Sequence, residues 1–114
     1  MAEKQDLPGG FEQLVMLAVA GLGEGAYGMT VRKALEERTE RSVSLGAVYS
    51  TLDRLETKRY VTSVQAPGDA ERGGRARRFF RLTAPGVRAL NEGIRALDRM
   101  REGVNVIPRP ARAT

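Results

Sequence analysis

The sequence predicts a mainly α fold with one small β-hairpin, which places it in the α+β class. Apolar residues recur at helical spacing in four segments, 11–22, 27–39, 44–58 and 84–104. Two β-rich stretches, 60–65 and 77–83, flank a segment that contains proline and glycine, as the strands of a hairpin do. With 114 residues the chain is long enough for one domain with a modest core and too short for two.

Composition narrows the function classes. The chain holds 19 Lys and Arg against 14 Asp and Glu, for a net charge of +5, and its pI is near 10.2. Such a basic balance favours a polyanionic partner. The absence of Cys and His removes disulfides, thiolate chemistry, the usual general base and the commonest metal ligands. We therefore expect no enzyme, no metal and no cofactor.

The first helix is predicted over residues 11–22, after the helix-breaking segment 7–10. Its apolar run is too short to span a membrane, and the acidic Glu3 and Asp6 before it are atypical of a secretory signal. We expect a cytoplasmic protein without a membrane partner. Helical spacing assigns its core-facing side to Phe11, Leu14, Val15, Ala18 and Leu22.

The segment Gly23-x-Gly25-x-x-Gly28 matches the spacing of a dinucleotide-binding turn. The acidic residue that should follow about 20 positions later is missing, and the chain is short for a doubly wound sheet. We interpret the glycines as helix-ending and turn residues. A small nucleotide-binding protein remains the weaker alternative.

Residues 27–39 form the second predicted helix, with Val31, Ala34 and Leu35 on its buried side. A short link, 40–43, leads to Ser44, whose hydroxyl suits the N-cap of a third helix. The third helix places its apolar residues on one side: Leu45, Val48, Leu52 and Leu55.

The opposite side of this third helix is small and hydroxyl-bearing over its first two turns, where a solvated face more often shows Lys and Glu. Such a surface suits close approach to a DNA groove, although a plain amphipathic surface helix is the alternative. Two helices, a short link and a capped third helix make a helix-turn-helix, whose last helix is the recognition helix. The predicted DNA-binding residues here are Tyr27, Ser44, Gly46, Ala47, Tyr49, Ser50, Thr51 and Arg54.

The predicted hairpin has a long tip, 66–76, that contains two glycine turns. Arginines gather on the tip and the outgoing strand, and no acidic residue follows Glu71 there. A merely soluble hairpin would mix both signs. We interpret the hairpin as a wing whose arginines meet phosphates or enter the minor groove, with Arg72, Arg75, Arg77 and Arg78 as DNA-binding residues.

Thr83 is predicted to cap a last helix, in whose first turn Pro85 is tolerated. A helix of about 19 residues is near 28 Å long, more than a core of this size needs. Folding back on its own domain would explain only the start of the stripe. We predict a dimer interface made by Val87, Leu90, Ile94, Leu97 and Val104. The predicted organisation is thus a winged helix-turn-helix domain over 7–83, a C-terminal dimerisation helix over 84–104 and a disordered tail over 105–114.

Several segments resemble the PadR family of bacterial transcriptional regulators. They are Tyr27-Gly-Met, Leu35-Glu-Glu-Arg-Thr, the block from Ser42 to Lys58, Glu71-Arg-Gly-Gly-Arg and Phe79-Phe-Arg-Leu-Thr-x-x-Gly. The resemblance implies a winged helix-turn-helix repressor that dimerises through its last helix and responds to a small molecule or stress. It also implies that Tyr49 and its small neighbours contact DNA. The chain looks like the short subgroup with one C-terminal helix, lacks tryptophan, and has Lys58-Arg59 where a lysine-glycine commonly stands.

The sequence therefore predicts a sequence-specific repressor that binds a pseudo-palindromic operator in double-stranded DNA as a homodimer, with an unidentified small-molecule effector. A winged-helix protein–protein adaptor is the second hypothesis. Salt dependence separates the two, because several phosphate contacts make affinity fall steeply as salt rises.

Overall fold

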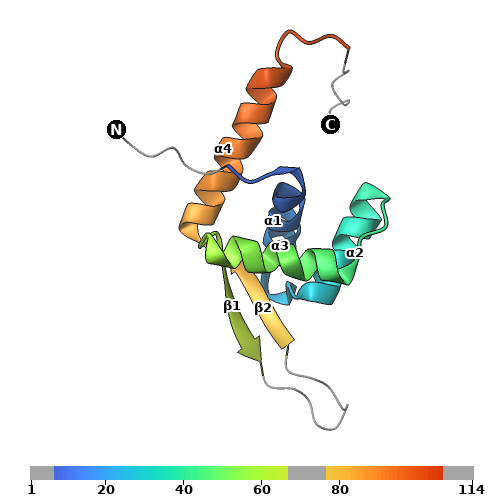
Figure 1. Ribbon diagram of the computed structural model, residues 1–114, viewed down its shortest axis with the longest axis vertical. Helices are drawn as coiled ribbons and strands as arrows, with labels where there is room; N and C mark the ends of the chain where they lie inside the picture. Colours follow the sequence, from blue (N-terminus) through green and yellow to red (C-terminus); the bar gives the residue numbers. More distant parts are fainter. Residues whose placement is uncertain (1–6, 67–76, 107–114) are drawn as a thin grey trace.

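Four α-helices and a two-stranded antiparallel hairpin make up the described chain, residues 7–66 and 77–106 of a computed structural model (Figure 1). The mainly helical α+β class predicted from the sequence is confirmed. In chain order the elements are α1 (Gly10–Leu22), the 3₁₀ turn η1 (Gly23–Gly25), α2 (Gly28–Thr39), α3 (Leu45–Thr57), β1 (Val61–Ala66), β2 (Arg77–Leu82) and α4 (Ala84–Arg101).

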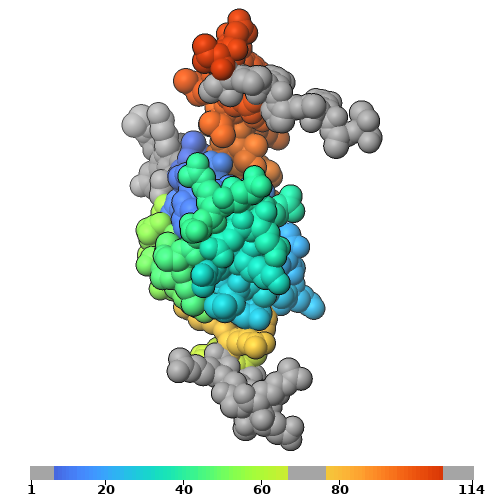
Figure 2. All heavy atoms as spheres, turned by 90° about the vertical axis from the view of Figure 1, so that its right-hand side faces the viewer, coloured from blue at the N-terminus to red at the C-terminus, as the bar shows by residue number. Residues whose placement is uncertain are grey.

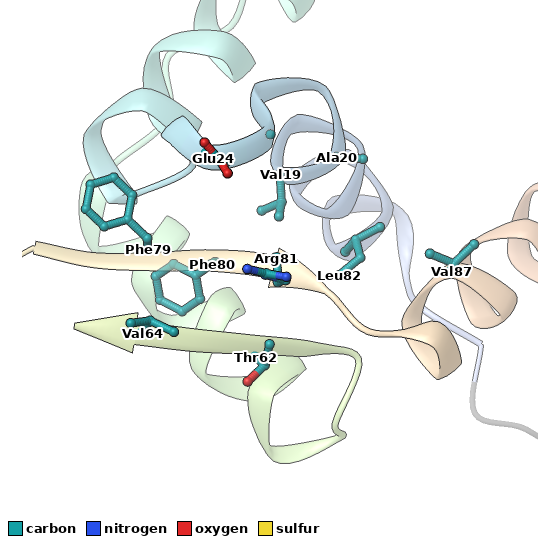
Figure 3. Close-up of a pocket in the computed structure, with 11 residues that line it drawn as sticks. Val19, Ala20, Glu24, Thr62, Val64, Phe79, Phe80, Arg81, Leu82 and Val87 are labelled. Atoms are coloured by element: carbon teal, nitrogen blue, oxygen red, sulfur yellow. The ribbon is translucent and has the colours of Figure 1, made fainter. Parts of the chain in front are cut away.

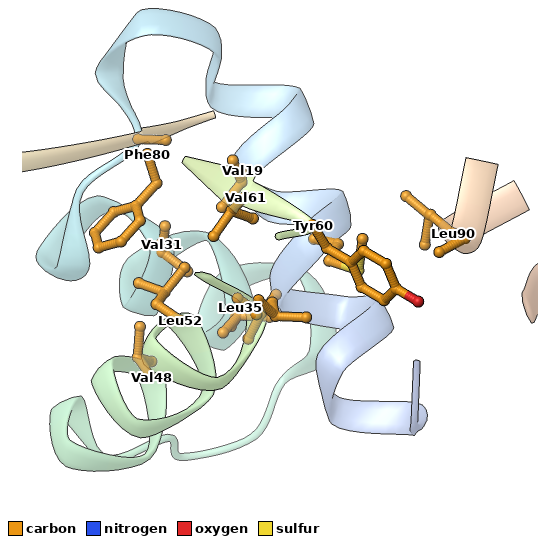
Figure 4. Close-up of a cluster of buried hydrophobic side chains, with 14 residues drawn as sticks. Val19, Val31, Leu35, Val48, Leu52, Tyr60, Val61, Phe80 and Leu90 are labelled. Atoms are coloured by element: carbon orange, nitrogen blue, oxygen red, sulfur yellow. The ribbon is translucent and has the colours of Figure 1, made fainter. Parts of the chain in front are cut away.

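One apolar core lies between the first three helices, the hairpin and the start of α4 (Figure 4). α1 contributes Val15, Met16 and Val19 to it. The predicted inner face of α1 was therefore wrong in part, because Leu14 is 39% exposed while Met16 and Val19 are buried. The cause is that α1 is apolar nearly all round, so its periodicity does not select one side.

The glycine motif forms a turn between two helices. Gly23 ends α1 with a φ of 58°, a left-handed conformation that glycine adopts without steric cost. The only sheet in the described ranges is the antiparallel hairpin, so the motif lacks the strand before it that a dinucleotide site requires. The structure thus supports the reading of these residues as turn glycines and does not support the nucleotide-binding alternative.

α3 has the predicted cap and the predicted inner face. The Ser44 hydroxyl accepts a hydrogen bond of 3.0 Å from the Ala47 N–H, and Val48, Leu52 and Leu55 are completely buried. At the other end Arg59 adopts a φ of 65°, which lets the Tyr60 N–H donate to the Leu55 carbonyl at 2.9 Å. Arg59 thus takes the left-handed position at which glycine is the usual residue.

The hairpin pairs Val61 with Leu82 at its base and Ala66 with Arg77 at its outer end. Phe80 is buried, and its N–H donates to the Ala26 carbonyl at 2.8 Å. β2 is therefore held against the link between η1 and α2 as well as against β1. The predicted tip residues Arg72 and Arg75 lie outside the described residues.

α4 begins as predicted, with the Thr83 hydroxyl accepting from the Gly86 N–H at 3.0 Å. It ends at Arg101, three residues before the predicted end, and Val104 lies beyond the helix, with its N–H donating to the Arg101 carbonyl at 3.1 Å. Most of the predicted tail, 107–114, lies outside the described residues. Among the residues that are described, no helix is long and apolar enough to cross a membrane.

Candidate nucleic-acid interface

The first two turns of α3 present a small, uncharged outer surface. Five of the residues predicted to bind DNA lie exposed on it: Ser44, Gly46, Ala47, Tyr49 and Ser50. α3 crosses the molecule above the base of the hairpin, with its buried side on the core (Figures 1 and 4). A duplex approaching this surface would meet backbone, hydroxyls and one phenol instead of long charged side chains.

Tyr49 is held in place by α2. Its side chain is 38% exposed, and its ring lies against Gly28, where an added Cβ would overlap the ring atoms. Gly28 itself is buried at the start of α2. The absence of a side chain at Gly28 therefore positions the tyrosine on the outer margin of α3.

The structure corrects the prediction for Thr51. This side chain is 2% exposed and packs inside the domain, where its hydroxyl accepts a hydrogen bond of 3.3 Å from Arg54 Nη2. Helical spacing had placed Thr51 on the flank, but the neighbouring elements close over that flank. A residue with almost no surface cannot touch DNA without unfolding, so we remove it from the interface.

Beside α3, an aromatic pair joins the wing to the start of α2. The rings of Tyr27 and Phe79 meet edge to face with centroids 5.3 Å apart, and the Arg77 guanidinium lies 4.8 Å from the Tyr27 ring centre. Arg77 itself is exposed. Two residues predicted from the sequence to bind DNA, Tyr27 and Arg77, are thus brought into one cluster.

Glu12 on α1, which no sequence pattern marks as functional, binds the far end of α3. It is buried, accepts the Gly9 N–H at 2.9 Å, and pairs with Lys58 at 3.1 Å and with Arg54 at 3.4 Å. Burial alone would raise the pKa of Glu12, but the Gly9 hydrogen bond and the two cations outweigh it and leave the pKa below its ordinary value. Arg54, which was predicted to bind DNA, is therefore paired with Glu12 of its own chain, although about half of the Arg54 side chain is exposed.

Arg78 is likewise engaged, in this case by two carboxylates on α3. Its guanidinium binds Asp53 at 3.1 Å and also binds Glu56, and its Nε donates to the Ser63 hydroxyl at 3.1 Å. Ser63 in turn donates to Glu56 at 2.6 Å. The sequence predicts Arg78 as a DNA-binding residue only because arginines gather on the wing. Its partners lie on another element, which no local pattern reveals.

The stripe predicted for dimerisation divides into two parts along α4. Leu90 is only 6% exposed and packs on the core of its own chain, so its assignment to the interface is corrected. Ile94 is partly buried against the same core. Val87 and Val104 are exposed, and Leu97 is 56% exposed. Figure 2 shows the distal part of α4 standing clear of the helical body.

Among the grooves on the surface of residues 7–66 and 77–106 are two apolar ones. One, of about 430 Å³, runs between the wing and the end of α1 and includes Val64, Phe79 and Val87 with Glu24 and Arg81 (Figure 3). The other, of about 460 Å³, lies between α1 and α2 and is lined in part by Leu14 and Leu17. Within the described ranges no cluster of acidic residues is arranged to hold a metal ion.

A helix-turn-helix followed by an antiparallel hairpin defines the winged-helix class of domains. The family model of the transcriptional regulator PadR-like family matches residues 16–92, so the chain belongs to that family. Members of this family are transcriptional regulators and not enzymes.

Solved structures share this fold. A PadR-like transcription factor from Bacteroides fragilis is 24% identical, with a TM-score of 0.72 over 86% of this chain and 89% of the other. A PadR family regulator from Eggerthella lenta is 28% identical, with a TM-score of 0.68 over 82% and 80%. One from Clostridium difficile is 22% identical, with a TM-score of 0.68 over 85% and 97%. Comparison with curated protein sequences gave no match.

Proposed function

We propose that this PadR-like regulator is a repressor that binds a pseudo-palindromic operator as a homodimer. In each subunit the N-terminal half of α3 enters the major groove, and the wing contacts the neighbouring backbone. The observation that carries the proposal is the outer face of α3. Gly46, Ala47 and Ser50 are exposed together on it, and Tyr49, whose ring packs against Gly28, lies at its margin. Arg77 on the adjoining hairpin supplies a cation for a nearby phosphate.

The homodimer is proposed from the distal half of α4. Leu97 and Met100 follow the core-facing Leu90 and Gly93 by seven residues each, which places them on the same side of the helix. Leu97 is 56% exposed and Met100 is 77% exposed, because the apolar core of the domain does not extend that far along α4. A second copy of α4 would cover them, and two α3 helices would then meet two half-sites.

Relief of repression by a small-molecule effector is part of the proposal, as the resemblance to the family implies. The apolar grooves provide room for a ligand of modest size. The groove of Figure 3 is lined by wing residues, so a ligand there would act on the position of the wing.

Selection from a random DNA library with the purified protein tests the function. We expect a two-fold symmetric sequence and an affinity that falls steeply with salt. Tyr49→Ala and Ser50→Ala should each weaken operator binding by about 1–3 kcal/mol. Glu37→Gln, on exposed α2 surface, is the matched control that should leave affinity nearly unchanged.

Unchanged affinity of both α3 variants would remove this helix from the interface. Failure to enrich any sequence, together with weak salt dependence, would favour the protein–protein adaptor.

A further inference from the structure

The junction between the wing and α3 is built around one arginine. Arg78 on β2 donates to the Ser63 hydroxyl on β1 and to the carboxylates of Asp53 and Glu56 on α3. Its guanidinium also lies 5.1 Å from the Phe80 ring centre, over a side chain that is part of the core. One planar side chain thus joins both strands of the wing to the recognition helix.

We propose that Arg78 is a positioning residue for operator recognition, one that sets the place of the wing relative to α3 without contacting DNA itself. The inference rests on the proposed function and adds a residue role to it. The Nε, Nη1 and Nη2 atoms of Arg78 each donate within the protein, and two carboxylates offset its charge, so its attraction for a phosphate is reduced. The fork geometry matters, because a lysine at this position would supply the charge without joining three partners at once.

The position of the junction on α3 explains why it matters for binding. Asp53 follows Ser50 by three residues, so the exposed Asp53 carboxylate lies one turn beyond the proposed reading surface. An unpaired carboxylate there would repel phosphates. Arg78 therefore both neutralises the end of the reading surface and fixes the distance from it to Arg77, its neighbour on β2.

Replacing Glu56 gives the sharpest test, because a charge effect and a positioning effect predict opposite changes in operator affinity. Glu56→Gln deletes a negative charge next to the proposed DNA surface, which by charge alone should strengthen binding. If Arg78 positions the wing through Glu56, the same change should weaken operator binding by about fivefold. Arg78→Gln should weaken it by at least as much, and the double variant by less than the product of the two factors.

Salt dependence and charge-matched variants separate positioning from direct contact. Arg78→Gln should leave the slope of log K against log salt unchanged, and Arg78→Lys should not restore affinity. Arg81→Gln, which removes the same charge from an exposed position on β2, is the matched control for Arg78→Gln. Glu37→Gln is the control for Glu56→Gln. Stronger binding by Glu56→Gln would show that charge and not positioning decides affinity, and a slope shallower by about 0.9 in Arg78→Gln would show that Arg78 contacts a phosphate. Either result would overturn the proposal.

A measurement on the DNA-free protein keeps this inference separate from the proposed function. Because the chain has no cysteine, spin labels can be placed at Ala47→Cys and Val64→Cys alone, both at exposed positions. In dimers that carry one labelled subunit, prepared by mixing with an excess of unlabelled protein, we expect one narrow distance distribution, and a clearly broader one in Arg78→Gln at the same secondary-structure content. Equal widths would refute the positioning role even if the protein binds its operator. A narrow distribution that broadens in a protein with no operator binding would instead refute the proposed function alone.

Discussion

α3 and α4 are both amphipathic, but their apolar faces differ in how far the rest of the chain covers them. On α3 the apolar side is covered from Val48 to Leu55, Leu45 at its start is partly buried, and the opposite side is small and uncharged over the first two turns. On α4 the apolar side is covered at Leu90 and bare at Leu97, although the two residues share one face. The difference underlies the proposal that α3 meets DNA with its polar side and that α4 meets a second subunit with its apolar side.

The largest effect is expected where the apolar face is covered. Leu52→Ala should lower the free energy of unfolding by about 2–5 kcal/mol, because it opens a cavity in a closed core. Leu97→Ala should cost far less when measured at a protein concentration too low for dimers. Denaturant unfolding of both variants checks the contrast, and similar costs at low concentration would mean that Leu97 is packed within its own chain.

Placing a charge on the bare part of α4 should break assembly. Leu97→Glu would bury an unpaired carboxylate in an apolar seam, which is strongly unfavourable. Light scattering should then show monomers, and operator affinity should fall because two linked half-sites become independent. Arg95→Glu on the opposite face of α4 is the control and should remain dimeric. A wild-type protein that is already monomeric at micromolar concentration would refute the proposed dimer.

The buried Glu12 gives α3 a pH-dependent attachment to α1. Its pKa lies below the ordinary value of 4.5, so its stabilising effect is present at neutral pH and is lost as pH falls through the lowered pKa. Glu12→Gln should therefore destabilise the fold at pH 7, by about 1–3 kcal/mol, and the difference should narrow at pH 3. Urea unfolding at the two pH values measures it. A difference independent of pH would show that the charge of Glu12 is unimportant.

The smallest effect is expected at the end of α3. Arg59 holds a left-handed φ of 65°, which costs a residue with a Cβ about 1–2 kcal/mol. Arg59→Gly should raise the free energy of unfolding by about 0.5–1 kcal/mol, after the greater chain entropy of glycine is subtracted. Thermal unfolding checks the sign, and Thr57→Gly, at the last residue of α3, should act in the opposite direction. A loss of stability in Arg59→Gly would point to a contact of the arginine side chain.

Local signals made much of α3 and α4 predictable. The hydroxyls of Ser44 and Thr83 cap the helices that follow them, and the inner face of α3 follows from apolar spacing alone. The buried face of α1 was harder to predict, because Leu14 and Met16 are both apolar and only tertiary packing decides which of them is buried.

The charged residues were the least predictable part of the candidate site. The Arg54–Glu12 pair joins residues 42 positions apart, and the Arg78–Glu56 pair joins residues 22 apart. A count of arginines along the sequence cannot show which of them already have partners within the fold. The exposed fraction of a side chain does not reveal its partners either, since Arg54 and Arg78 are both partly exposed while they bind carboxylates.

Cleavage of operator DNA from a single attached iron chelate tests the division between α3 and α4 most directly. Ser42→Cys, in the exposed link before α3, would carry the chelate beside the outer face of that helix, and Met100→Cys would carry it on the distal half of α4. We expect strong cleavage from position 42 in two segments about 34 Å apart, and little or none from position 100. Stronger cleavage from position 100, or a single segment from position 42, would refute the division between the two helices.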